Sequence, residues 1–330
     1  MKNKKLLITL VALVIIVVGA IVVPKLSSDK KDKSVDSKNL QVGVLQFVTH
    51  PALDEIYKGV QDGLSDEGFK DVKINFLNGE ADQSKLQTMS KELVSQKNDV
   101  LVGIATPSAQ SLANATDTIP IVMGAVSDPV GAKLVSNLKK PDKNVTGVSD
   151  KFPIDKQLDL MRQILPELKT VGVLYSSSED NSKSQVAEFK KAAEATGIQV
   201  VEYAVPSTNE ISSTVEVAVG KVDAIYTPMD NTIASAFPTV ISVANKAKKP
   251  VFPSVDTMVE QGGLAAVAIN QHDLGVATGK MAAKILNGEK VADIPVEEFS
   301  KVKPIINENA AKELGINIPD SVAKDADKVK

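Results

Sequence analysis

The sequence predicts an α/β protein made of two doubly wound parallel-sheet lobes joined by a multi-strand hinge. Two observations lead to this class. From residue 40 onward, short apolar runs rich in β-branched residues alternate with amphipathic helical stretches, as in parallel strands joined by crossover helices. The same pattern then starts again about halfway along the chain, which indicates a second lobe of similar plan.

The first series of elements is expected between residues 40 and 123. The run DVLVGIA at 99–105 is continuously apolar, as in strands that are buried on both faces of a parallel sheet. The helix expected at 51–67 begins with a proline, which fits the first turn of a helix. The expected strands are 40–46, 72–78, 99–105 and 119–123, and the expected helices are 51–67, 82–95 and 107–115.

Three short matches relate the second half of the chain to the first. They keep the same order and lie 121 to 130 residues apart, which makes a chance origin for all three hard to maintain. The matched pairs are VGVL at 42–45 and 171–174, Thr106-Pro107 and Thr227-Pro228, and the strand-preceding prolines Pro120 and Pro250. Generic similarity between α/β units remains the alternative to a true repeat.

The lobe boundaries follow from where the pattern restarts and from the helix at 274–287, which reads as further first-lobe material. We expect lobe one to contain residues 40–148 and 271–330, and lobe two to contain residues 149–270. The chain would then cross between the lobes near 145–153, near 268–273 and within 302–306. Several short crossings of this kind make a hinge.

The N-terminus carries a membrane signal. Residues 6–23 contain no charge and follow three lysines, and 18 helical residues span about 27 Å, close to the thickness of a bilayer core. We expect a short basic cytoplasmic end at 1–5, an uncleaved membrane helix at 6–23 and a flexible tether at 24–39, with the body outside the cytoplasm. A cleaved export signal is the alternative, although no small-x-small cleavage pattern follows the apolar run.

Composition excludes several classes of function. The 330 residues include no cysteine, two histidines and one arginine, so disulfides, thiol chemistry and a histidine-rich metal site are not expected. The net charge of −3 gives no indication of nucleic-acid binding. We expect no cofactor and no bound metal.

Polar loops follow the expected strands of both lobes. In open parallel sheets, ligands bind beyond the carboxyl ends of the strands, where helix N-termini offer free N–H groups. The loops at 46–50, 106–109, 126–128, 176–181, 228–232 and 254–256 are rich in hydroxyl and amide side chains, contain acids in lobe two and lack lysine and arginine. A free amino acid matches both the donors and the acids. Helix capping is the alternative role for most of these side chains.

Signatures of common enzymes are missing from the sequence. It contains no G-x-G-x-x-G after a strand, no phosphate-binding G-x-x-x-x-G-K-[ST], no G-x-S-x-G elbow and no HExxH. The acid pair Glu179-Asp180 reads as a solvated surface or a helix cap. We therefore expect no catalytic residues and a protein that is not an enzyme.

Five stretches of the body resemble the substrate-binding proteins of ABC importers, and among them the tryptophan/tyrosine substrate-binding family. The stretches are VGVLQFVTHPALDEIYKGVQDGL at 42–64, GIATPSAQSLA at 103–113, LYSSSEDNSKSQVAEF at 174–189, PMDNTIASAF at 228–237 and QHDLGVATGKMA at 271–282. The resemblance implies a type I periplasmic-binding fold that closes on one aromatic amino acid, either tryptophan, tyrosine or phenylalanine. It also implies delivery to a membrane permease with a cytoplasmic ATPase, by a protein that we expect to be a monomer.

The resemblance also implies a set of ligand contacts. Asp230 is expected to hold the ligand ammonium group, and Thr106 with the helix start at Ser108 is expected to hold its carboxylate. The full set of expected contacts is Gln46, Phe47, Thr106, Ser108, Ala109, Ser177, Ser178, Asn181, Asp230, Asn231, Thr232 and Ser254.

Two alternatives stay open. One is a sugar or nucleoside receptor of the same fold, and the other is the ligand-sensing ectodomain of a signalling protein. The chain departs from many relatives by lacking a lipid-anchored cysteine. The uncleaved N-terminal helix would replace that anchor.

Overall fold

The computed structural model describes residues 39–299 and 301–329. The expected basic end at 1–5, the expected membrane helix at 6–23 and all but the last residue of the expected tether lie outside the described residues. Within the described ranges, no helix has the length and apolar character needed to cross a bilayer.

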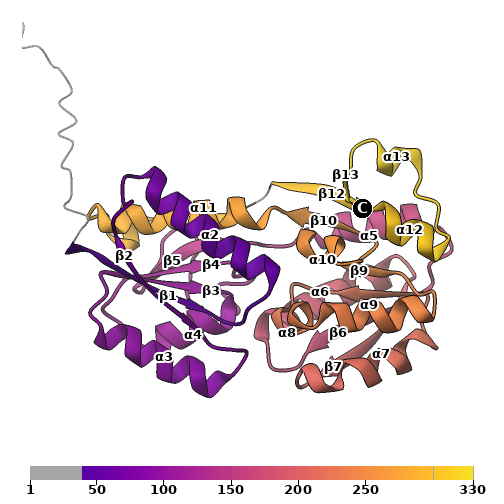
Figure 1. The fold of residues 1–330 in the computed structure, drawn as a ribbon, viewed down its shortest axis with the longest axis horizontal. Coiled ribbons are helices and arrows are strands. Elements are labelled where there is room, and N and C mark those ends of the chain that lie inside the picture. The colour runs from indigo at the N-terminus through magenta and orange to yellow at the C-terminus, as the bar shows by residue number, and fades with distance from the viewer. Residues whose placement is uncertain (1–38, 300, 330) are drawn as a thin grey trace, which may run out of the picture. The chain divides into compact units, whose positions relative to one another are not determined.

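The first sheet has six parallel strands in the order β11-β5-β4-β3-β1-β2. Helices α2 and α11 lie along one face of this sheet, and α3 and α4 lie on the other (Figure 1). The elements are β1 (Gln41–Gln46), α2 (Pro51–Asp66), β2 (Lys73–Asn78), α3 (Gln83–Ser95), β3 (Val100–Ile104), α4 (Thr106–Ala115), β4 (Ile121–Gly124), β5 (Val145–Ser149), α11 (Gln271–Leu286), a 3₁₀ turn η3 (Val291–Asp293) and β11 (Glu297–Glu298).

The second sheet has four parallel strands in the order β7-β6-β8-β9. Its elements are α5 (Ile154–Ile164), β6 (Thr170–Ser176), α6 (Asp180–Ala195), β7 (Gln199–Val205), η2 (Thr208–Glu210), α7 (Ile211–Val219), β8 (Ala224–Thr227), α8 (Asn231–Ser235), α9 (Phe237–Lys246), β9 (Val251–Pro253) and α10 (Asp256–Glu260). A third, smaller sheet joins β10 (Ala265–Ile269), β12 (Val302–Asn307) and β13 (Asp327–Val329), with α12 (Glu308–Leu314) and α13 (Asp320–Ala323) between the last two strands.

The three sequence matches occupy equivalent places in the two large sheets. The VGVL motifs lie in β1 and β6, and each of these strands is flanked by the next two strands along the chain. The two Thr-Pro pairs stand at the carboxyl ends of β3 and β8, where Thr227 is the last residue of β8, and the matched prolines precede β4 and β9. The α/β class with two doubly wound parallel sheets is therefore confirmed.

The C-terminal segment lies elsewhere than the sequence analysis expected. Residues 271–298 belong with the first sheet, since β11 pairs with β5. From β12 onward, however, the chain packs into the core of the second sheet, where Ile306, Ala311 and Val322 are buried. The antiparallel pairing of β12 with β10 draws this segment to the second lobe. Lobe one is hereafter residues 41–149 and 271–298, and lobe two is residues 150–269 and 302–329.

Helices α2 and α11 pack at unusually close range through glycines. A Cβ atom added at Gly59 would lie 2.2 Å from the carbonyl oxygen of His272, and one added at Gly275 would lie 2.2 Å from the carbonyl oxygen of Ile56. Gly63 and Gly279 repeat this relationship one turn further along. This contact joins the beginning and the end of lobe one, because α2 and α11 lie far apart in the sequence (Figure 1).

Candidate functional site

Loops from both lobes line one small cavity of about 30 Å³. Most of these loops follow the carboxyl ends of parallel strands, which is where ligands bind in sheets of this kind. The lining residues from lobe one are His50, Ala52, Leu53, Ala125, Ser127 and Gln271, and those from lobe two are Asp150, Asn181, Met229, Asp230, Asn231, Ala234 and Val255.

Asp150 presents a buried carboxylate oxygen to this cavity. The side chain follows β5 and is only 3% exposed, and its Oδ1 atom has no hydrogen-bond partner among the described residues. Burial raises the pKa of Asp150 to about 6, while a hydrogen bond from the Ser127 side chain acts in the opposite direction. A buried acceptor without a donor is costly, so Asp150 is suited to receive a donor from a ligand.

Asn181 and His50 add two more unpaired acceptors. Nδ2 of Asn181 donates to the carbonyl oxygen of Met229 at 2.9 Å, and the Oδ1 atom of Asn181 has no partner in the described part of the chain. Burial lowers the pKa of His50 to about 4, so its ring is neutral near pH 7. The Nε2 atom of His50 lies 3.3 Å from Oδ1 of Asn231, which can only accept, so we assign the ring proton to Nε2 and leave Nδ1 as an acceptor.

Asp230 acts as a helix cap in the structure. Its Oδ1 accepts the backbone N–H of Ile233 at 2.8 Å, and its Oδ2 accepts the backbone N–H of Ser176 at 2.5 Å. Burial and, after it, the charge of Glu179 raise the pKa of Asp230 to about 8. The two oxygens thus already have backbone donors, which is the capping role that the sequence analysis kept as an alternative.

Glu179 organises the loop that carries Asp230, Asn231 and Thr232. Its Oε1 accepts both the backbone N–H and the hydroxyl of Thr232 at 2.8 Å, and its Oε2 accepts Nδ2 of Asn231 at 2.6 Å. The side chain is fully buried, so the expectation of a solvated acid was wrong for Glu179, whereas Asp180 is exposed. Sequence reasoning missed Glu179 because a strand-end acid looks like a cap until its distant partners are known.

The remaining expected residues divide into buried and exposed positions. Ser177 and Ser178 are exposed, and Ser254 donates its hydroxyl to the carbonyl oxygen of Thr227 at 2.9 Å behind the strand end. Phe47 is buried in the core of lobe one, and Gln46 donates from Nε2 to Asp54 at 2.8 Å. Of the twelve expected contacts, only Asn181, Asp230 and Asn231 line the small cavity.

Helix α4 places the expected carboxylate site in its first turn. The helix begins at Thr106, directly after Ala105, whose positive φ of 75° turns the chain out of β3. Ser108 is fully buried and its Oγ has no partner among the described residues. Ala109 packs against Gly103 in the preceding strand, where a Cβ atom would come within 2.7 Å.

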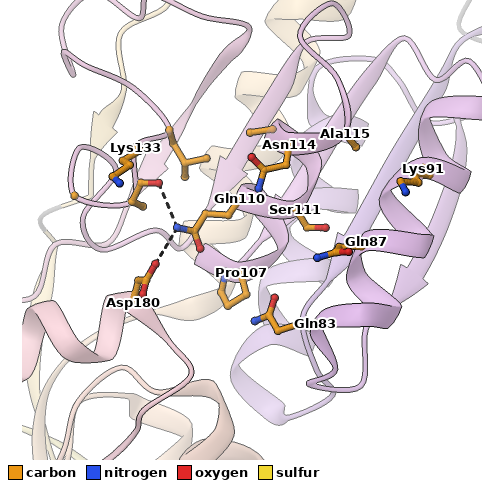
Figure 2. Close-up of a pocket in the computed structure, with 14 residues that line it drawn as sticks. Gln83, Gln87, Lys91, Pro107, Gln110, Ser111, Asn114, Ala115, Lys133 and Asp180 are labelled. Carbon is orange, nitrogen blue, oxygen red and sulfur yellow. Dashed lines mark hydrogen bonds between the residues drawn. The ribbon is translucent and has the colours of Figure 1, made fainter.

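A larger hollow of about 570 Å³ lies outside this site. It is formed by α3, α4 and residues 131–134 of lobe one, with Asp180 of α6 at its edge (Figure 2). Figure 2 shows the Gln110 side chain pointing toward the loop near Lys133 and toward Asp180, where its Nε2 donates to the carbonyl oxygen of Ala132 at 3.2 Å and to Oδ2 of Asp180 at 3.3 Å. None of the twelve expected contacts lines it, and its rim carries Lys91 and Lys133, so we place the functional site at the small cavity.

The chain has two parallel sheets in which the first strand lies between the next two, and a polar cavity is lined from both lobes. These features place it in the class of type I periplasmic-binding folds. Residues 41–330 match the family described as ABC transporter substrate binding protein, and the chain belongs to this family.

Three relatives illustrate the similarity. The chain is 40% identical to the tyrosine-binding protein of Clostridioides difficile (strain R20291), over 87% of this chain and 84% of that protein. It is 60% identical to an ABC domain from Streptococcus pneumonia crystallised in complex with L-Trp, with a TM-score of 0.87 over 88% of this chain and all of that one. It is 41% identical to the ligand-free, open structure of a substrate binding protein with adhesive properties from Clostridium difficile, with a TM-score of 0.67 over 88% and 99% of the two chains.

Proposed function

We propose that this substrate-binding protein captures an aromatic amino acid and delivers it to the permease of an ABC importer. The observation that carries the proposal is the set of three unpaired acceptors around one cavity, namely Asp150 Oδ1, Asn181 Oδ1 and His50 Nδ1. A primary ammonium group has three N–H donors and one positive charge, which matches two neutral acceptors and one carboxylate. Asp150 replaces Asp230 as the proposed charge partner, since both Asp230 oxygens are engaged in capping.

The other parts of the ligand have matching surroundings. The first turn of α4 lies outside the lining of the small cavity but follows β3, next to the strand whose end supplies Ala125, and we propose that its free N–H groups and the unpaired Ser108 hydroxyl hold the carboxylate. Leu53, Met229 and Val255 supply an apolar wall for a ring, and the methionine sulfur makes favourable contacts with aromatic edges. The names of the relatives, one tyrosine-binding and one crystallised with L-Trp, support the same ligand class.

Capture requires the lobes to move apart and close again. A cavity of about 30 Å³ holds little more than a water molecule, so an aromatic amino acid enters only when the lobes separate. The higher TM-score against the L-Trp complex than against the open, ligand-free structure supports a closed arrangement here. A ligand that touches both lobes shifts the equilibrium toward closure by its extra affinity for the closed state.

We further propose that residues 6–23 anchor the body at the outer face of the membrane. The uncharged run behind three lysines supports retention of the N-terminus in the cytoplasm. N-terminal sequencing of the protein from a membrane fraction tests this. An intact N-terminus is expected, and a mature chain that starts after residue 23 would establish the cleaved signal instead.

Calorimetry on the refolded, ligand-stripped body tests the ligand class. We expect L-Trp, L-Tyr or L-Phe to bind, and we expect indole-3-propionate to fail because it lacks the ammonium group. Tryptamine, which lacks the carboxylate, should also bind more weakly than L-Trp. Equal binding of L-Trp and indole-3-propionate would contradict the proposed ammonium site. Binding of sugars but of no amino acid would show that the proposed ligand class is wrong.

A further inference from the structure

Three side-chain hydrogen bonds join helix α6 of lobe two to lobe one. Gln185 Nε2 donates to Ser127 Oγ at 3.0 Å, Ser184 Oγ donates to Asp128 Oδ2 at 3.1 Å, and Gln110 Nε2 donates to Asp180 Oδ2 at 3.3 Å. The last of these contacts is visible in Figure 2. All three involve the first two turns of α6, and the contact between His50 of lobe one and Asn231 of lobe two joins the same lobes beside the small cavity.

Gln185 differs from the other two contacts in its burial. The Gln185 side chain is only 4% exposed and its partner Ser127 is half-buried, whereas Asp180 is exposed and Ser184 and Asp128 are both half-buried. Exposed polar contacts exchange readily with water and contribute little, but a buried amide must keep its partners. Among the three contacts of α6, the Gln185 hydrogen bond is therefore the one whose loss should weaken closure most.

The Gln185 amide also belongs to the proposed ligand site. Its Oε1 accepts the backbone N–H of Met229 at 3.1 Å, and the carbonyl oxygen of the same Met229 accepts Nδ2 of Asn181. On the other side, Ser127 and Asp150 both line the small cavity, and the Ser127 hydroxyl acts against the effect of burial by lowering the pKa of Asp150. A continuous series of contacts thus runs from Met229 through Gln185 and Ser127 to Asp150.

The direction of these bonds matters because a hydroxyl has a single proton. Ser127 Oγ accepts the Gln185 N–H, which leaves its own proton free to donate to Asp150. A donated proton favours the charged carboxylate that an ammonium ligand needs. Gln185 reaches Ser127 only when the lobes are together. The Gln185 amide therefore connects closure of the lobes with the charged state of the Asp150 carboxylate.

We propose that Gln185 is a positioning residue that couples capture of the ligand ammonium group at Asp150 to closure of the two lobes. This inference rests on the proposed function for its ligand. It concerns a residue that lines neither the small cavity nor the larger hollow.

Gln185→Glu is the sharpest variant, because a carboxylate still accepts the Met229 N–H but cannot donate to Ser127. Ser127→Ala removes the acceptor from the other side without adding a charge. Gln110→Ala is the matched control, since it removes an exposed contact between the same two lobes. A thermal melt of each variant verifies that it folds.

Two readouts separate coupling from a merely structural role. The chain has no cysteine, so a dye pair on Lys91→Cys and Glu216→Cys, one exposed site on each lobe, reports closure by energy transfer. Stopped-flow with the amino acid that binds best gives the association and dissociation rates. We expect Gln185→Glu to lower the closed fraction with and without ligand, and to raise the dissociation rate at least tenfold with the association rate changed less than threefold.

The double variant completes the test. If the Gln185–Ser127 bond carries the coupling, combining Gln185→Glu with Ser127→Ala raises the dissociation rate little beyond the larger single effect. Additive effects, or a wild-type closed fraction and dissociation rate in Gln185→Glu, would overturn the proposal. Failure of the wild-type chain to bind any amino acid would instead overturn the proposed function, while the closed fraction without ligand would still report on Gln185.

Discussion

Glu179 and Thr232 lie 53 residues apart and are joined twice, because one carboxylate oxygen accepts both the backbone N–H and the hydroxyl of the threonine at 2.8 Å. This double contact holds the loop after β8 against the start of α6. The two segments that supply Asn181 and Met229 to the cavity therefore move as one unit.

Removal of the Glu179 carboxylate should destabilise lobe two. In Glu179→Ala, the backbone N–H groups of Asn231 and Thr232 lose a buried acceptor, which should lower the free energy of unfolding by about 3 kcal/mol. Chemical denaturation measures this change. Asp180→Ala, at the exposed neighbouring position, should stay within about 0.5 kcal/mol of wild type. A Glu179→Ala variant as stable as that control would contradict the organising role.

The charged Asp150 carboxylate should lower the stability of the ligand-free protein while it raises the affinity for the ligand. Because burial raises its pKa to about 6 from an ordinary value near 3.8, the folded chain binds the proton more tightly than the unfolded chain. The contribution of Asp150 to the free energy of unfolding is then most favourable below about pH 4, becomes less favourable as the pH rises toward 6, and amounts to a cost of about 3 kcal/mol near pH 7. Asp150→Asn removes the charge and should raise the melting temperature of the ligand-free protein above pH 6.

The same Asp150→Asn variant should weaken amino-acid binding by about 2–4 kcal/mol, since it leaves the ammonium group without its charge partner. Calorimetry at pH 7.5 provides the measurement. Asp230→Asn is the matched comparison, because this carboxylate caps α8 and should affect stability more than affinity. A greater loss of affinity in Asp230→Asn than in Asp150→Asn would indicate that Asp230, and not Asp150, binds the ammonium group.

Amino-acid affinity should depend on pH through Asp150. The ammonium ligand pairs with the charged form, so the affinity should fall about tenfold for each pH unit below 6. Burial raises the pKa of Asp230 in the same cavity to about 8, so a further dependence near pH 8 that is lost in Asp230→Asn belongs to that residue. The pKa of His50, near 4, keeps that ring neutral over this range. Titrations from pH 5 to 8 should lose this slope in Asp150→Asn. Burial also raises the pKa of Asp256 to about 6, so a slope lost in Asp256→Asn instead would point to that residue.

The glycine contact between α2 and α11 should tolerate no side chain. Gly59→Ala or Gly275→Ala would bring a methyl group within 2.2 Å of a backbone carbonyl oxygen, which neither helix can relieve without moving away. We expect a loss of about 3 kcal/mol or more in the free energy of unfolding. Gly220→Ala, whose added methyl group would meet only the carbonyl oxygen of Val217 at 4.0 Å, should be neutral or slightly stabilising. Equal effects at the three sites would contradict the close packing.

Local patterns were enough to predict most elements of the two large sheets. The continuous apolar run at β3 and the repeated VGVL motif depend only on burial and on strand period, which neighbouring residues carry themselves. The assignment of residues 302–329 to lobe one failed for the opposite reason. The pairing of β12 with β10 joins strands more than 30 residues apart, and no local pattern specifies that partner.

The site shows the same division between local and distant causes. The polar loops after the strands, including Asn181 and Asp230, are recognisable because their residue types are typical of strand ends in parallel sheets. Asp150 and Glu179 were not singled out as contacts, since an acid in a loop is ordinarily solvated and only burial by distant segments leaves one with a free oxygen and encloses the other among donors.

Residue order alone was therefore sufficient for the α/β class, the duplicated plan and the polar loops at the strand ends, because hydrophobic period and turn chemistry act over a few neighbouring residues. Tertiary packing determines that Asp150 Oδ1 stays unpaired, that Asp230 caps a helix and that the segment from β12 onward belongs to lobe two. Those outcomes depend on contacts between segments tens to more than a hundred residues apart, whose free energies exist only once the chain has folded.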